Sequence, residues 1–81
     1  MSVTVTVLLF AELRVAAERA QLELDLPAGA TVRTAADRLE RVLGTDRLQG
    51  VMCAVNERYA DPATALAEGD VVAFLPPVSG G

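Results

Sequence analysis

The carboxyl end of the chain holds the residues whose types and spacing suggest chemistry. The last two residues are Gly80 and Gly81. Because glycine has no Cβ atom, two such residues fit a channel only as wide as backbone and adopt φ/ψ values closed to other residues. The reactive group would be the α-carboxylate of Gly81. The alternative is an inert, frayed end, since chain termini are often rich in small residues.

The side chains offer little catalytic chemistry of their own. The sequence has no histidine, which excludes a Ser-His-Asp triad, a zinc-ligating His pair and an imidazole base, and we expect no metal site. All seven basic residues are arginines, so no lysine amine is present. The single thiol, Cys53, stands in an apolar run, where cysteine is usually a small buried hydrophobe rather than a nucleophile.

The composition indicates one small acidic domain. The chain has 81 residues, of which 52% are apolar, and a net charge of −4. This charge opposes binding to nucleic-acid phosphates and suits a basic protein partner. No uncharged stretch approaches the ~20 residues of a membrane-spanning helix. Residues 3–10 lack the basic flank of a secretory signal, so we expect a cytoplasmic protein without membrane contact.

Two amphipathic strands are predicted in the first third of the chain. Residues 3–7 alternate valine with threonine, and residues 22–26 alternate leucine with acidic residues. This period is typical of a strand with one buried face. Residues 11–20 are rich in helix formers but short, which predicts a turn or two of helix between the strands. We expect a β-hairpin with a wide connection.

One longer helix is predicted between Thr31, a residue type preferred at N-caps, and Gly44, which suits a left-handed C-terminus. Its apolar residues recur at three- and four-residue intervals: Val32, Ala35, Ala36, Leu39, Val42 and Leu43. The charged residues of the other face are interpreted as a solvated surface: Arg33, Asp37, Arg38, Glu40 and Arg41.

Three further strands are predicted in the second half. Residues 51–55 are nearly all apolar, as in a strand buried on both faces. Tyr59 and Ala60 suggest a short edge strand, and a tight turn at residues 68–70 leads into a last strand at 71–75. This order predicts an α+β domain of the β-grasp type over residues 1–75. Its mixed sheet of four to five strands would pack on one main helix, with the first and last strands paired in parallel at the centre.

Residues 76–81 are predicted to form an extended tail outside this domain. Pro76 and Pro77 fix φ at its base, so the tail loses less entropy when a partner captures it. Six extended residues reach at most ~20 Å, enough to enter an active site on another protein. We expect mobility from Val78 onward in the free protein.

The tail and the strand before it resemble a known family. Residues 66–81 (LAEGDVVAFLPPVSGG) closely resemble the ending of molybdopterin synthase small subunits, in the MoaD/ThiS family of ubiquitin-like sulfur carriers. The segments FAELR at 10–14, GATV at 29–32 and AVN at 54–56 extend the resemblance over essentially the whole chain. Val15 and Val71 replace acidic residues common in the family, which affects surface contacts but not the tail.

The resemblance implies a sulfur-carrier role in molybdenum cofactor biosynthesis. An ATP-dependent activating enzyme would adenylate Gly81, and a persulfide donor would supply sulfur to give a C-terminal thiocarboxylate. This group would donate sulfur to a cyclic pyranopterin precursor in a large subunit, within an assembly of two small and two large subunits. The chain would be a non-catalytic donor subunit that binds no cofactor itself. The tail residues inserted in the partner's active site would be Pro76, Pro77, Val78, Ser79 and Gly80.

Phe74 and Leu75, beside the tail, are candidates for docking on the activating enzyme and the large subunit. For Phe74 a place in the core is an equal alternative. Val72 and Phe74 share one face of the last strand, whereas Ala73 and Leu75 share the other. The sequence leaves open which of these faces is inside.

Other functions remain alternatives. Carriers for thiamin thiazole synthesis, tRNA thiolation or cysteine synthesis share the Gly-Gly ending, although Pro76-Pro77 favours the molybdopterin branch. A protein modifier that conjugates Gly81 to target lysines belongs to a different class. The absence of lysine excludes ordinary lysine-linked chains of this protein but not single conjugation. A plain β-grasp interaction module with an inert tail is a further alternative.

Overall fold

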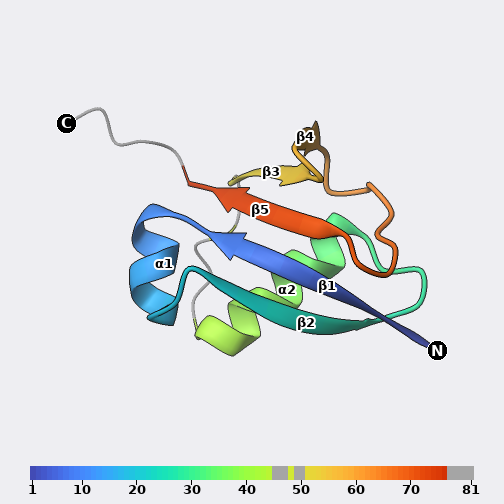
Figure 1. Ribbon diagram of the computed structural model, residues 1–81, viewed down its shortest axis with the longest axis horizontal. Coiled ribbons are helices and arrows are strands. Elements are labelled where there is room, and N and C mark those ends of the chain that lie inside the picture. The colour runs from blue at the N-terminus through green and yellow to red at the C-terminus, as the bar shows by residue number, and fades with distance from the viewer. Residues whose placement is uncertain (45–47, 49–50, 77–81) are drawn as a thin grey trace.

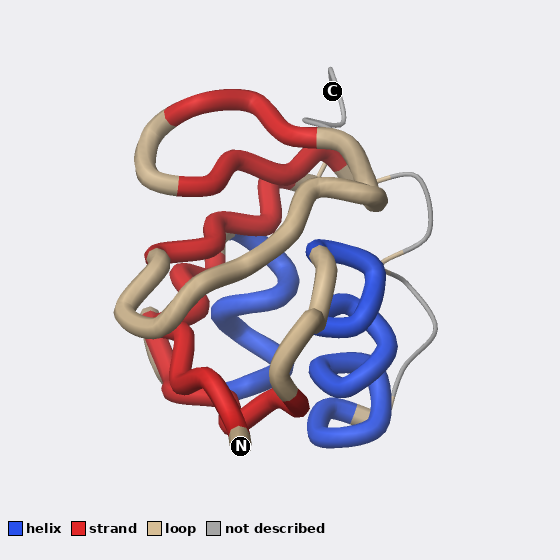
Figure 2. The backbone as a smooth tube through the Cα atoms, turned by 90° about the vertical axis from the view of Figure 1, so that its right-hand side faces the viewer, coloured by secondary structure: helices blue, strands red, loops and turns tan. Residues whose placement is uncertain are grey.

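The computed structural model describes residues 1–44, 48 and 51–76. Its elements are β1 (Ser2–Leu9), α1 (Ala11–Ala17), β2 (Gln21–Pro27), α2 (Val32–Leu43), β3 (Met52–Val55), β4 (Arg58–Ala60) and β5 (Val71–Leu75). The strands form one mixed sheet in the order β2-β1-β5-β3-β4 (Figure 1). Both helices lie on the same side of this sheet (Figure 2). The two-layer β-grasp architecture expected from the order of elements is therefore confirmed.

The first and last strands pair in parallel at the centre of the sheet, as predicted. The register places Leu9 beside Phe74. On the other side of β1, the antiparallel strand β2 completes a wide hairpin in which α1 forms the connection. On the other side of β5, β3 runs antiparallel and is followed by the short edge strand β4. Strand β5 is thus held between two neighbours.

Helix α2 has the predicted ends. The Thr31 hydroxyl accepts a hydrogen bond from the Thr34 N–H at 3.4 Å, and the Thr34 hydroxyl accepts one from the Thr31 N–H at 3.1 Å. This reciprocal capping box fixes the first turn. Gly44 ends the helix with φ of 68°, in the left-handed region that glycine adopts without strain.

Val42, which the sequence places on the apolar face of this helix, is 57% exposed. It lies near the carboxyl end of α2, next to the edge strand β2, and among the described residues no further strand continues the sheet beyond that edge. The apolar stripe of the helix therefore runs slightly past the sheet that covers it. The residues of this stripe buried against the sheet are Val32, Ala35 and Leu39.

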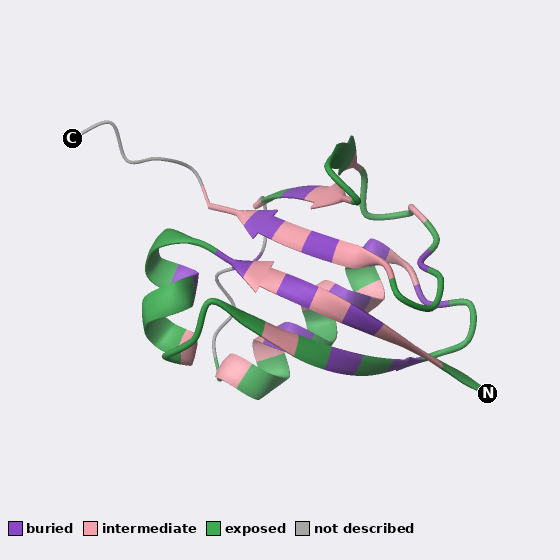
Figure 3. Cartoon of the chain, in the orientation of Figure 1, coloured by how far each residue is buried: buried purple, intermediate pink, exposed green. Residues whose placement is uncertain are grey.

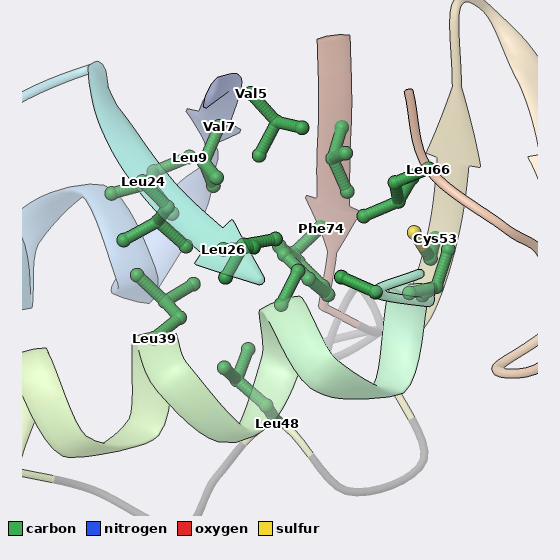
Figure 4. Close-up of a cluster of buried hydrophobic side chains, with 14 of the residues drawn as sticks. Val5, Val7, Leu9, Leu24, Leu26, Leu39, Leu48, Cys53, Leu66 and Phe74 are labelled. Atoms are coloured by element: carbon green, nitrogen blue, oxygen red, sulfur yellow. The ribbon is translucent and has the colours of Figure 1, made fainter. Parts of the chain in front are cut away.

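The core fills the space between α2 and the sheet face toward it (Figure 4). Phe74 projects from β5 into this space, and Leu39 enters it from α2 (Figure 4). The largest fully buried side chains are Phe74, Leu9, Leu13, Leu26, Leu39, Val5, Val7 and Val72. A chain this short depends on such complete burial for its stability.

The expectation that β3 is buried on both faces is wrong. Cys53 is 6% exposed, whereas its neighbour Met52 is 56% exposed. Among the described residues, helices cover one face of the sheet only, so alternate residues of β3 face outward although they are apolar (Figure 2). The second sheet face is consequently open.

Candidate functional site

The base of the predicted tail is anchored by the central strand β5. Val72 and Phe74 are 0% and 2% exposed and hold this strand against the core. Leu75, the last residue of β5, and Pro76 after it are half-buried. Pro76 is the last residue of the chain that the structure describes. The predicted tail residues beyond it lie outside the described residues: Pro77, Val78, Ser79, Gly80 and Gly81.

The start of β5 is fixed by Asn56, in the turn between β3 and β4. The Asn56 side-chain carbonyl accepts a hydrogen bond from the Val71 N–H at 3.0 Å, and the Asn56 N–H donates to the Val71 carbonyl at 2.8 Å. The Asn56 amide group also donates to Asp70 Oδ1 at 3.0 Å. Asp70 Oδ2 in turn accepts from the Ala67 N–H at 2.8 Å. These bonds set the strand's position before it reaches the tail.

Of the two alternatives for Phe74, an exposed docking residue and a core residue, the second is confirmed. Its side chain is 2% exposed and points toward α2 (Figure 4). Because side chains alternate across a strand, burial of Phe74 directs Leu75 to the open face. Phe74 thus holds the end of β5 through packing, whereas Leu75 lies half-buried on the open face.

The open face carries an apolar surface beside the tail base, which we call the open-face patch. The strand registers place its members next to one another: Leu8 beside Ala73, Ala73 beside Ala54, Ala54 beside Tyr59, and Met52 beside Leu75. Met52 and Tyr59 are 56% and 75% exposed, respectively. Figure 3 shows the alternation of buried and half-buried residues along β5.

Sequence reasoning had singled out Leu75 of this patch but not its other members. The available signal was the alternation of side chains between the two faces of a strand. Once Phe74 is assigned to the core, the pairing of β5 with β3 puts Met52 and Ala54 on the open face.

Cys53 belongs to the core rather than to a reactive site. It lies beside Phe74 in the register, and its sulfur is on the side of the sheet that faces α2 (Figure 4). Burial raises the pKa of the Cys53 thiol to about 11. At neutral pH the group is a protonated thiol, which is a poor nucleophile. The structural interpretation of this cysteine is therefore confirmed.

Within the described ranges, no group of three or more His, Cys, Asp or Glu side chains could hold a metal ion. No helix in the described part of the chain is long and apolar enough to cross a membrane.

The fold and the strand leading to the tail define a β-grasp domain with a Gly-Gly end. A family model described as the ThiS family matches residues 7–81, and this chain belongs to the ThiS family. It is similar to the molybdopterin synthase sulfur carrier subunit of Arabidopsis thaliana, with 36% identity over 84 residues that cover 99% of this chain and 85% of the relative. The subunit of the same name from Mycobacterium tuberculosis is 37% identical over 82 residues, covering 98% and 99%.

Solved structures agree with this assignment. SAMP1 from Haloferax volcanii, a small archaeal modifier protein, superposes with a TM-score of 0.85 at 30% identity, covering 96% of this chain and 99% of that one. A putative molybdopterin converting factor subunit 1 from Pyrococcus furiosus gives a TM-score of 0.83 at 32% identity, covering 95% and 100%. The ubiquitin-like β-grasp fold is thereby confirmed.

Proposed function

We propose that this chain is the sulfur-carrier subunit of a molybdopterin synthase and that Gly81 carries the sulfur. The observation that carries this proposal is the identity of 36% and 37%, over nearly the whole chain, with two molybdopterin synthase sulfur carrier subunits. The geometry of β5 supports it. A central strand fixed by Phe74 and Asn56 provides a firm base for a tail that reaches into another protein.

The proposed chemistry begins with the Gly81 carboxylate, which is a poor electrophile. An activating enzyme transfers AMP from ATP to this carboxylate, with release of pyrophosphate, and gives an acyl adenylate. The terminal sulfur of a persulfide displaces AMP and forms an acyl disulfide that joins Gly81 to the donor. A thiol then cleaves the S–S bond, leaving a thiocarboxylate on Gly81 and a disulfide on the donor. The thiocarboxylate is a soft nucleophile at neutral pH, by the same logic that makes thiolates stronger nucleophiles than thiols.

The large subunit supplies the pocket and the catalytic groups in this proposal. The chain has no histidine and no lysine, and its one thiol is buried and protonated, so it offers no imidazole, amine or thiolate for catalysis. The loaded tail brings sulfur to a cyclic pyranopterin precursor held by that partner. A dithiolene contains two sulfurs, which fits two carriers acting with two large subunits.

The open-face patch is the proposed docking surface for both the large subunit and the activating enzyme. It is apolar and includes Leu75, the last residue of β5. Apolar anchors at the centre of an interface contribute most of the binding free energy. Docking through this patch places the tail at the partner's active site without any rearrangement of the core.

The proposal is tested by intact mass spectrometry. The full chain is incubated with the activating enzyme, ATP and a persulfide donor, and a chain lacking Gly81 serves as control. We expect a mass gain equal to one oxygen replaced by one sulfur in the full chain only. No gain, under conditions where a known carrier is loaded, would contradict the proposal and favour the interaction module.

A second variant separates folding from loading. Gly80→Val should leave the unfolding midpoint unchanged and yet block loading or transfer, because a channel wide enough only for backbone does not admit the added side chain. Ser79→Ala is the matched control and should remain active. A large loss of stability in Gly80→Val would contradict the separation of tail and core.

The likeness to SAMP1 favours a second candidate, a protein modifier joined through Gly81 to a lysine of a target. The two functions give different products. A carrier yields a free chain with a thiocarboxylate, whereas a modifier yields an isopeptide adduct that survives boiling in detergent and thiol. Peptide mapping of such adducts, with the Gly81-deleted chain as control, distinguishes them.

A further inference from the structure

A groove of about 410 Å³ borders the free edge of β2, on the helix side of the sheet. Its lining is mixed: the apolar part includes Ala17 of α1, Leu22 and Leu24 of β2, and Val42 and Leu43 of α2, and the charged residues are Arg19 and Glu23. Val42 is 57% exposed here, the residue of the helix stripe that the sheet leaves uncovered. The groove therefore offers apolar contact area next to an unpaired strand edge.

The backbone of β2 is directed toward this edge at every second residue. The N–H groups of Thr4 and Thr6 donate toward the β5 side of the sheet, at 2.9 Å each. The residues of β2 that pair with Thr4 and Thr6 are Asp25 and Glu23. In an antiparallel pair, when one residue points its N–H and C=O groups away from the partner strand, the residue opposite does the same. The backbone groups of Asp25 and Glu23 therefore point away from β1, toward the free edge. The Asp25 carbonyl accordingly accepts a hydrogen bond from Arg38 Nη1 at 3.0 Å. Within the described chain, no hydrogen bond reaches the outward N–H or C=O of Glu23.

The charges along this edge determine what kind of strand fits. Glu23 and Asp25 are exposed on the open face, where Asp25 Oδ1 also accepts a hydrogen bond from the Thr4 hydroxyl at 2.7 Å. Opposite charges across a strand pair stabilise it, and like charges directly opposite destabilise it. A second copy of β2 would bring acidic residues against acidic residues, so self-pairing is disfavoured. Basic residues on that face of an added strand are favoured instead.

We propose that the edge of β2 binds an extended segment of a protein partner as a sixth strand of the sheet, with basic residues alternating with apolar ones. The basic residues lie beside Glu23 and Asp25, and the apolar residues enter the groove beside Val42. Main-chain hydrogen bonds to Glu23 provide affinity and the alternate side chains provide specificity. Arg38, bound to the Asp25 carbonyl, marks the end of the pairing.

This edge is distinct from the surface proposed for sulfur transfer. Strand β1 separates β2 from β5, and none of the residues named for the open-face patch lies on β2. The partner segment and the large subunit therefore occupy different parts of the molecule. The inference does not depend on the proposed sulfur chemistry, and it holds or fails separately.

The test is an NMR titration of the full chain, labelled with nitrogen-15, with a capped peptide that alternates valine and lysine. We expect chemical-shift changes confined to residues 21–25 and the carboxyl end of α2, and slower hydrogen exchange at the Glu23 amide. A peptide alternating valine and glutamate should bind at least about tenfold more weakly. No binding of the valine–lysine peptide at about 1 mM, or shifts centred on β4 or the open-face patch, would overturn the proposal.

Matched variants isolate the strand edge. Glu23→Pro removes the outward N–H and leaves the ladder with β1 intact, because proline is tolerated where an edge N–H faces outward. We expect the Kd to rise at least about tenfold, and less for Glu23→Gln, which keeps the N–H. Val42→Asp, at an exposed position, should also weaken binding by about tenfold without loss of fold. If Glu23→Pro does not fold, the affinity of Val42→Asp tests the proposal. Unchanged affinity in the folded variants, or self-association through β2, would overturn the proposal.

Discussion

The two faces of the sheet carry similar apolar residues, but the residues of one face are mostly buried and those of the other are half-buried or exposed. On the face toward α2, Val72 and Phe74 of β5 are 0% and 2% exposed. On the open face, the neighbouring strand β3 presents Met52 at 56% exposure. The difference arises because, in the part of the chain that the structure describes, the helices cover one face only. Apolar character alone therefore does not show whether a residue stabilises the fold or contacts a partner; the covering layer decides it.

The largest effect that separates the faces is expected from truncating Phe74. Phe74→Ala should lower the free energy of unfolding by about 3–5 kcal/mol, through lost burial and a residual cavity. Leu75→Ala, one residue further and on the open face, should cost only about 1 kcal/mol. Urea unfolding followed by circular dichroism measures both. Equal losses would mean that the two faces do not differ in this way.

A charge introduced on the open face should have the opposite effect: little change in stability and weaker binding to a partner. Met52→Arg is expected to change the free energy of unfolding by less than about 1 kcal/mol, since the side chain is already exposed. It should weaken binding to the large subunit by about 2 kcal/mol, the size typical of a central interface residue. Calorimetric titration measures the affinity. Ala63→Arg, an exposed loop position with the same change of charge, is the control and should bind normally.

The covered face also depends on how firmly its helix begins. Thr31→Ala removes the hydroxyl that caps α2 and should cost about 1 kcal/mol of unfolding free energy. Arg33→Ala, in the same first turn but exposed, should stay within about 0.5 kcal/mol of the parent. Thermal or urea unfolding measures both changes. A similar cost for the two variants would show that the capping box contributes nothing specific.

The last prediction concerns Cys53 on the covered face and its dependence on pH. Because burial raises its pKa to about 11, the folded state holds the thiol proton more tightly than the unfolded state. The resulting contribution to stability is complete below the thiol's ordinary pKa of 9.0 and is lost as pH rises through about 11. The difference in urea midpoint between the parent and Cys53→Ala should therefore narrow between pH 8 and pH 11. A difference that does not change with pH would contradict the buried, neutral thiol.

Local sequence signals sufficed for the elements and their order. Alternating residues predicted β1 and β2, and Thr31 and Gly44 predicted the limits of α2. The order of strands and helices along the chain predicted the parallel pairing of the first and last strands. These signals act within a few residues, where backbone geometry and hydrogen-bonding capacity decide the outcome.

Which residues of β3 and β5 face the core did not follow from such signals. Whether Phe74 or Leu75 faces inward depends on which face the helix covers, and this is decided by packing between distant segments. The bonds of Asn56 to Asp70 and Val71 likewise join residues far apart in sequence. The exposure of Val42 depends on where the sheet ends. The predicted roles of Gly81 and the tail remain predictions.

The parallel pairing of β1 with β5 also has a kinetic consequence. The two central strands lie at opposite ends of the domain sequence, so the sheet closes only when residues 71–75 become available. Non-local pairings of this kind make folding slower than local ones. Until that moment β1 and β3 each lack their shared neighbour and present unpaired edges, which invite aggregation and proteolysis. A growing chain therefore cannot complete the sheet until residues 71–75, at the end of the domain sequence, have been synthesised.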